Sequence, residues 1–253
     1  MQTSESWIEY FRQNLQRKRI NWAIAPSLTK EELAAVLPSM QAWQLGETSD
    51  GAHLLAAAKR YAGKIGDDYY CKAVQLFIQE EQKHGNNLGR YLDLIGEKRI
   101  GKDWGDTLFR KIRYFNTSME LWTIAVITVE STAQVFYQSL KNATGCTLLK
   151  QICTDILIDE AAHIKFQMQR LEIIFSTKTV MQKIIRYQFY RLFYFSTIMV
   201  VWMAHRKAFK AGGNTFTKYL YKMNNKFKKT IHHLYIQKSL LPETSTLAIN
   251  HQL

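Results

Sequence analysis

The chain has 253 residues, of which 47% are hydrophobic, and it contains 12 Gly but only three Pro. This length allows one domain with a proper core and an appendage, and so few prolines suit long helices. The alternation of strand and helix patterns is missing, and no Gly-rich phosphate loop occurs, which argues against an α/β nucleotide-binding fold. We therefore predict an all-α protein.

The three cysteines, Cys71, Cys146 and Cys153, form no Cys-x-x-Cys pair. Together with the lack of an apolar run at the N-terminus, they predict a protein of the reducing cytoplasm. Any electrons needed for chemistry would then come from an external donor, because the chain offers no thiolate pairs for an iron–sulfur site of its own. The oligomeric state is not encoded in a recognisable pattern.

In chain order, residues 1–38 form a predicted N-terminal helical segment, in which Thr29 and Glu32 have the spacing of a capping box. Pro38 is expected to break or restart the helix. Apolar periodicity then predicts a four-helix unit over 39–176, with helices at about 39–63, 67–95, 116–142 and 146–176. A connection of about twenty residues at 96–115, with a small amphipathic piece around 103–113, can join two antiparallel helix pairs side by side.

Two copies of a Glu-x-x-His pattern lie within these helices, as Glu81 with His84 and Glu160 with His163. Residues three apart on a helix project from one face, so each pair offers a carboxylate and an imidazole to a common point. Both pairs are flanked by apolar residues on the same stripe. Carboxylates on an apolar seam are costly unless a metal or a partner charge compensates them, so the pairs predict half of a dinuclear metal site.

The other half needs one acid from each of the two remaining helices. Folding the chain back around residue 145 brings about position 128 level with the second pair, and Glu130 lies on the inward stripe there. The same construction around residue 65 points to about position 48, next to Glu47 and Asp50. We predict Glu47 as the ligand and keep Asp50 as its substitute or as a supporting group.

Residues 80–85 (EEQKHG), followed by Leu88, Leu92 and Gly96, and residues 159–163 (DEAAH) resemble the ferritin-like di-iron carboxylate superfamily. Locally they are most similar to the soluble acyl-carrier-protein desaturases, and the resemblance covers roughly residues 40–175. It implies a ferritin-like bundle in which two iron ions share two carboxylates, with one imidazole per iron and two terminal acids. The implied ligands are Glu81 and Glu160 as shared carboxylates, His84 and His163 as imidazoles, and Glu130 and Glu47 as terminal ligands.

The resemblance also implies that Glu80 and Asp159, the acids just before each ligand Glu, orient an imidazole from across the site. No catalytic residue beyond the metal ligands is predicted. Imidazole and carboxylate ligands suit iron or manganese, so two irons, manganese or a mixed Fe/Mn pair remain open as the cofactor. Ordinary surface acids and histidines, and a bundle that has lost its site, remain as alternatives.

Residues 177–253 form a predicted basic, aromatic-rich extension. From 173 to 242 there is no acid but thirteen Lys and Arg, which equals the whole net charge of +13. The most apolar run of the chain, 192–204, lies inside this segment and is too short to cross a bilayer. Three interpretations compete: a fifth helix packed on the bundle, peripheral contact with a membrane surface, and an acidic partner. The acidic partner would be a carrier protein or, with less support because no nucleic-acid module accompanies the charge, an RNA.

The predicted function is a di-iron oxidase or oxygenase that uses O₂ to desaturate or hydroxylate an organic, lipid-like substrate. Two alternatives stay open. The first is a ferroxidase or iron-handling protein, in which oxidised iron is itself the product. The second is a membrane-attached structural protein with a vestigial site.

Overall fold

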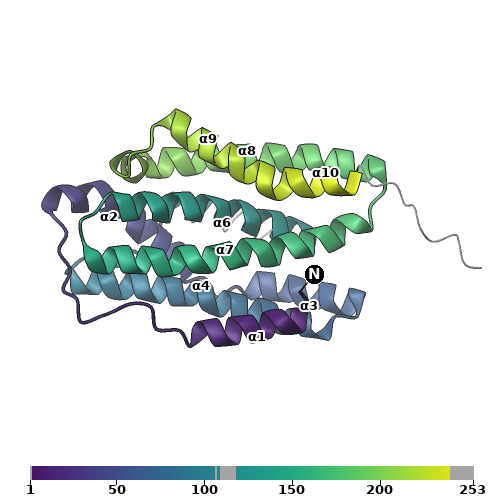
Figure 1. Ribbon diagram of the computed structural model, residues 1–253, viewed down its shortest axis with the longest axis horizontal. Coiled ribbons are helices and arrows are strands. Elements are labelled where there is room, and N and C mark those ends of the chain that lie inside the picture. Colours follow the sequence, from purple (N-terminus) through teal and green to yellow (C-terminus); the bar gives the residue numbers. More distant parts are fainter. Residues whose placement is uncertain (1, 106, 109–117, 240–253) are drawn as a thin grey trace, which may run out of the picture.

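The computed structural model describes residues 2–105, 107–108 and 118–239, and this part of the chain contains helices but no strand (Figure 1). The expectation of an all-α protein is confirmed. The helices, in chain order, are α1 (Ser4–Leu15), α2 (Lys30–Glu47), α3 (Ala52–Ile65), α4 (Asp68–Leu94), α6 (Met119–Asn142), α7 (Thr147–Ser176), α8 (Val180–Ala211), α9 (Phe216–Phe227), a π-helical turn η1 (Lys228–His232) and α10 (His233–Ser239).

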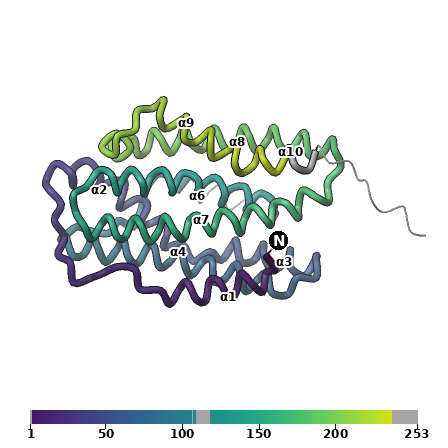
Figure 2. Tube along the Cα trace, in the orientation of Figure 1, coloured from purple at the N-terminus to yellow at the C-terminus, as the bar shows by residue number. Residues whose placement is uncertain are grey.

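The helices lie roughly parallel to one another in stacked layers (Figures 1 and 2). Helices α6 and α7 form the middle layer and pack along each other as an antiparallel pair, while α4 packs against α7, α2 and α3. Helix α1 covers the outer side of α4, and α8 covers α6 and α2 on the other side. The bundle of α2/α3, α4, α6 and α7 is therefore enclosed by one further helix on each of two sides.

The first bundle helix differs from the expected helix at 39–63. The Thr29 capping box is present and starts α2 at Lys30, but α2 runs through Pro38 without a break and ends at Glu47. The break falls instead at Gly51, whose φ of 63° lies in the left-handed region that glycine adopts easily. Contacts of α2 with both α4 and α8 hold the helix on either side of the backbone bond that Pro38 cannot make.

The other three bundle helices are confirmed to within three residues at each end. Most of the amphipathic piece expected at 103–113 lies outside the described residues. The division of the chain into segments 1–38, 39–176 and 177–253 stays a prediction.

Buried apolar residues form two clusters. One joins α6, α7, α8 and α9, and the other joins α1, α3 and the first half of α4. The buried acids and histidines of α4 and α7 lie between these clusters, so the polar centre of the bundle is closed by apolar side chains above and below.

Helices α8 and α9 form an antiparallel hairpin on top of α6. The Tyr194 hydroxyl donates to Met223 O at 2.9 Å, and the Tyr219 hydroxyl donates to Ile198 O at 2.9 Å, so each helix holds the other. At the hairpin's end, a Cβ on Gly212 would lie only 2.3 Å from Ser139 O. This hairpin accounts for the apolar run at 192–204, one face of which packs on the bundle. Among the described residues, no helix is both long and apolar enough to cross a membrane.

Candidate metal centre

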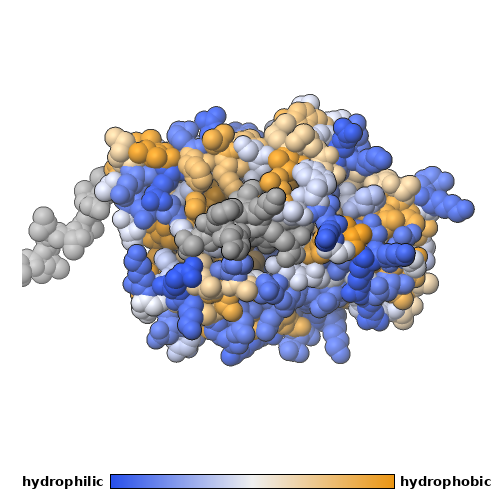
Figure 3. Space-filling view, turned by 180° about the vertical axis from the view of Figure 1, so that it is seen from behind, coloured by the Kyte–Doolittle hydropathy of each residue, from blue (hydrophilic) through white to orange (hydrophobic). Residues whose placement is uncertain are grey.

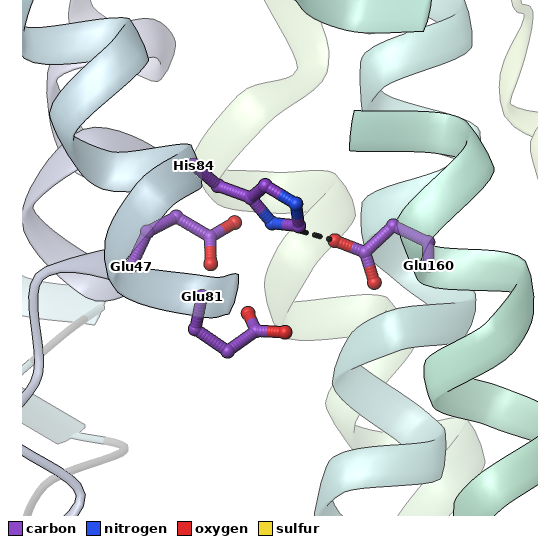
Figure 4. Close-up of side chains that lie close together, drawn as sticks. All are labelled: Glu47, Glu81, His84 and Glu160. Carbon is purple, nitrogen blue, oxygen red and sulfur yellow. Dashed lines mark ion pairs between the residues drawn. The ribbon is translucent and has the colours of Figure 1, made fainter. Parts of the chain in front are cut away.

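The two Glu-x-x-His pairs face each other across the interface between α4 and α7. His163 Nδ1 lies 2.7 Å from Glu81 Oε1 and 3.7 Å from Glu160 Oε2, while His84 Nδ1 lies 3.6 Å from Glu160 Oε1. The two imidazole rings are 5.7 Å apart between centroids. Figure 4 shows Glu81 and Glu160 reaching from opposite helices toward the space beside His84.

Six side chains together offer two groups of four ligand atoms, and within each group the atoms lie within 4.8 Å of one another. Both groups contain Glu81 and Glu160, which therefore stand between the two positions. The first group is completed by Glu47 and His84, and the second by Glu130 and His163. The acids of α2 and α6 thus lie at the same height as the pairs of α4 and α7.

The inward-facing atoms are well suited to hold cations. His84 Nδ1, His163 Nδ1, Glu81 Oε1 and both Glu160 carboxylate oxygens are buried and face one another across this space, with no hydrogen-bond partner outside it. Buried polar atoms nearly always have a partner, because leaving one without costs about 1–3 kcal/mol. Five such atoms aimed at one space, from imidazole and carboxylate groups only, match the ligand chemistry of iron or manganese.

The outward nitrogens of both imidazoles meet an acid from the opposite helix. His84 Nε2 lies 3.1 Å from Asp159 Oδ2, and His163 Nε2 lies 2.9 Å from Glu80 Oε2. A carboxylate accepting from one ring nitrogen fixes the ring's orientation and leaves the other nitrogen free of its proton for a metal. This crossed arrangement has the geometry that the sequence resemblance implies for Glu80 and Asp159.

A further layer of polar groups around these acids comes from Asn14 of α1, Arg19 of the loop after it and Lys83 of α4. The Asn14 amide donates from Nδ2 to Glu80 Oε1 and to Asp159 Oδ1, both at 2.7 Å, and so joins the two acids. Arg19 contacts Asp155 at 2.6 Å and Asp159 at 2.9 Å, and Lys83 contacts Asp159 at 2.7 Å. These cations compensate the buried negative charge from the surface side.

The acids on α2 and α6 are buried without such cations. Burial raises the pKa of Glu47 well above its ordinary value, and the negative charge of Glu81 adds to this. Burial also raises the pKa of Glu130 well above its ordinary value, and the negative charge of Glu160 is the next largest cause. Without metal ions, Glu47 and Glu130 therefore bind protons more readily and become neutral. Metal binding would release these protons.

The acid and imidazole of the closest pair shift in opposite directions. Burial opposes ionisation of both, but the His163 cation lowers the pKa of Glu81 to about 2, and the Glu81 carboxylate raises the pKa of His163 well above its ordinary value. The pKa of His84 is also raised, because burial is outweighed by its bond to Asp159 together with the charges of Glu81 and Glu160. The centre therefore stabilises positive charge at several points at once.

The end of α2 can approach α4 closely because Gly85 has no side chain. A Cβ at Gly85, the residue after His84, would lie 2.7 Å from Thr48 Cγ2 and 3.1 Å from the backbone of Glu47. The Glu47 carboxylate is also fixed by the Tyr137 hydroxyl, which donates to Oε1 at 2.7 Å. Close approach of the backbones brings Glu47 within reach of the α4 pair.

An apolar cavity of about 450 Å³ adjoins the centre. Glu47, Glu81 and Glu130 of the metal centre line it, and most of its other lining residues are apolar. These include Phe77 from α4, Val126 and Val129 from α6, and Phe193, Val200 and Ala204 from α8. A cavity of this volume and lining can hold a small organic molecule next to the acids.

Asp50, the predicted substitute for Glu47, belongs to neither group of four. Its Oδ1 accepts from Ala52 N at 3.0 Å at the start of α3, so it serves the helix terminus. Sequence reasoning missed Asn14, Arg19 and Lys83. Asn14 and Arg19 act on acids more than sixty residues away, and no local pattern reveals such a contact. Lys83 lies between Glu81 and His84, and its place beside a buried acid pair was a signal that could have been used.

Comparison with family models and with curated protein sequences finds no match. Among solved structures, the chain is similar to R2-like ligand-binding oxidases. A tyrosine-to-phenylalanine variant with an anaerobically reconstituted Mn/Fe cofactor matches with a TM-score of 0.62 and 18% identity, over 93% of each chain. A valine-to-alanine variant with the same kind of cofactor matches at 0.59 and 17%, over 94% of this chain and 93% of the other.

A third structure, a valine-to-leucine variant with an aerobically reconstituted Mn/Fe cofactor, matches at 0.59 and 16%, over 94% and 92% of the two chains. At such identities the likeness establishes the fold. It confirms the ferritin-like bundle that the sequence resemblance implies. The closer similarity to acyl-carrier-protein desaturases stays a prediction.

Proposed function

We propose that this protein is a di-metal oxidase that oxidises an apolar organic substrate. The observation that carries the proposal is the pair of four-atom groups that share Glu81 and Glu160, bordered by an apolar cavity. The likeness in fold to proteins whose structures contain a Mn/Fe cofactor supports it. When bound, two iron or manganese ions supply the electrons for O₂ activation and the oxidising power for attack on a carbon–hydrogen bond.

The chain's own residues hold and shield this centre. Glu81 and Glu160 would bind both ions, Glu47 and His84 one of them, and Glu130 and His163 the other. Asp159 and Glu80 keep the imidazoles turned inward through their Nε2 atoms. Phe77 stacks edge-on against His163 at 4.7 Å between centroids and helps to exclude water.

The cavity indicates the class of substrate. Its wall is formed mainly by aliphatic and aromatic side chains, and its polar part combines the acids of the metal centre with a few other polar residues, namely Ser49, Asp50, His53, Asp103, Thr132 and His205. An apolar chain or ring would gain the hydrophobic contribution of the wall while presenting a carbon–hydrogen bond to the centre. Desaturation and hydroxylation of a lipid-like molecule are the reactions that fit, with electrons from an external donor.

Oxygen uptake by metal-loaded protein tests the proposal. Protein loaded anaerobically with two ferrous ions per chain should consume O₂ in the amount that its own metal requires and then stop until a reductant is added. The metal should stay bound. A matched variant, Val129→Trp, fills the cavity and should keep the metal and this first uptake while losing binding of a medium-chain fatty acid used as an apolar probe.

Other outcomes select the alternatives. Oxidation of added ferrous iron far beyond two equivalents per chain, with ferric product accumulating, would replace the oxidase by a ferroxidase. Failure of carefully reconstituted protein to retain more than traces of metal would leave a vestigial site and overturn the proposal.

A further inference from the structure

The solvent-facing line of α8 is apolar for most of its length. Met181, Ile185, Leu192, Met199 and Met203 are 65%, 62%, 68%, 39% and 58% exposed. Their spacings of four, seven, seven and four residues place them on one line along the helix. In a helix that covers the outside of a domain, this line is normally polar. Figure 3 shows hydrophobic residues gathered in the upper part of this face, where α8 lies.

This line is separate from the faces of α8 that serve the fold. Tyr194, Ile198 and Val201 are buried against the bundle and α9, and Phe193 and Val200 border the cavity. The exposed line therefore does not contribute to the core of the described residues. Because an apolar stripe of this length is rare on an isolated surface, it indicates a partner.

The charged residues of α8 are all basic. Helix α8 has a kink at His205, and beyond it the helix continues with Arg206, Lys207 and Lys210, all three exposed. Arg191 flanks the middle of the line, and no acid occurs anywhere from residue 173 to 242. A surface that combines exposed Met, Ile and Leu with exposed basic residues complements an interface that is apolar inside and anionic outside.

We propose that the outer face of α8 docks on an anionic lipid surface, with the helix lying in the plane of the headgroups. The apolar line would enter the acyl boundary, and Arg206, Lys207 and Lys210 would meet lipid phosphates. A second copy of the chain fits less well, because it would bring another strongly basic layer against this one. The docking stands independently of the proposed oxidase reaction.

The location of α8 gives this docking a consequence for the cavity. The helix that would touch lipid on its outer side borders the apolar cavity on its inner side, through Phe193 and Val200. A lipid-like molecule would therefore have only one helix between its source and the metal centre. This consequence rests on the proposed function, whereas the docking itself does not.

Vesicle co-sedimentation of the full chain tests the docking. The protein should bind vesicles of phosphatidylcholine mixed with phosphatidylserine, and pure phosphatidylcholine vesicles far less. Added salt should weaken binding, because surface charges are screened within about 10 Å at 0.1 M ionic strength. Arg206→Gln with Lys210→Gln should weaken binding about twenty-five-fold, since each basic residue near such a surface contributes about fivefold.

Placing negative charges on the apolar line of α8 is the more discriminating test. Ile185→Glu with Leu192→Glu should abolish vesicle binding, while the control pair Leu94→Glu with Ile158→Glu, exposed on α4 and α7, should keep it. Unchanged helical content and two bound metal ions show that each variant folds. Three results would overturn the proposal: no binding by the full chain, equal binding by both pairs, or a dimer without vesicle binding that only the α8 pair dissociates.

Discussion

Three buried or nearly buried histidines belong to two different layers of the molecule, and their pKa values shift in opposite directions. His84 and His163, between α4 and α7, have raised pKa values because acids from the facing helices surround them. His205, at the kink of α8, contacts Ser39 and the rings of Trp43 and Phe136, and burial lowers its pKa to about 4.

Burial alone therefore does not decide whether a side chain here is charged. The lower layers contain acids that lie against the imidazoles, such as Asp159 beside His84 and Glu81 beside His163, and these acids support positive charge. The α8–α10 layer contains no acid from 173 to 239, and His205, which is buried there, stays neutral at neutral pH. The acids between α4 and α7 suit the binding of metal ions, and the α8–α10 layer suits packing against apolar side chains or lipid.

The largest expected effect comes from removing the shared acids. Glu81→Ala with Glu160→Ala should lower metal content from two ions per chain to none, because both four-atom groups lose two of their ligands. The metal-free variant should still fold, since the two apolar clusters that hold the helices together are unchanged. Elemental analysis after reconstitution measures the first effect, and denaturant unfolding the second.

The matched control for this change is Asp93→Ala with Glu172→Ala, which removes one acid from each of the same two helices outside the centre. This control should retain two ions. Full metal content in the Glu81/Glu160 variant would show that the ligands lie elsewhere.

The contrast between the histidines predicts a pH effect on stability. An unfolded chain protonates His205 near its ordinary pKa of 6.5, and the folded chain only near 4, so the unfolded state binds more protons between these pH values. His205 should therefore reduce the free energy of unfolding as pH falls from about 7, by about 3 kcal/mol at pH 4, since one pKa unit corresponds to about 1.4 kcal/mol.

Denaturant unfolding at pH 7 and pH 4.5 checks this effect. The difference in stability between the natural chain and His205→Asn should move by about 2 to 3 kcal/mol in favour of the variant at the lower pH. His233→Asn, a change of an exposed histidine in the same layer, is the control. A pH-independent difference for His205→Asn would mean that His205 is charged in the folded protein.

A smaller effect is expected where α1 supports the centre. Asn14→Leu removes the amide that joins Glu80 and Asp159, so both imidazoles lose part of their orientation, and metal affinity should fall about 10- to 100-fold. Competition titration with a chelator measures this, and Gln13→Leu, on the exposed side of the same helix, serves as the control. Equal affinity in Asn14→Leu and the control would confine Asn14 to a packing role.

The sequence predicted the bounds of α4, α6 and α7 closely because the apolar stripes of these helices are long and regular. It also placed Glu130 and Glu47 at the right height, because helices of equal rise keep distant residues level once the turn is known. It failed at Pro38, where contacts with α4 and α8 outweigh a local breaker. The contacts of Asn14 and Arg19 could not be found, because they depend on how an extra helix docks on α4, and no local periodicity encodes that.

The glycine next to His84 has a consequence for recognising related chains. Because α2 and α4 touch through their backbones at Gly85, the position acts as a spacer that sets how far Glu47 must reach. In any chain that builds its centre in this way, a larger residue there would force the first helix outward and leave a longer gap than a glutamate can span. A Glu-x-x-His-Gly segment, paired with an acid that ends the preceding helix, is thus a more selective search pattern than Glu-x-x-His alone.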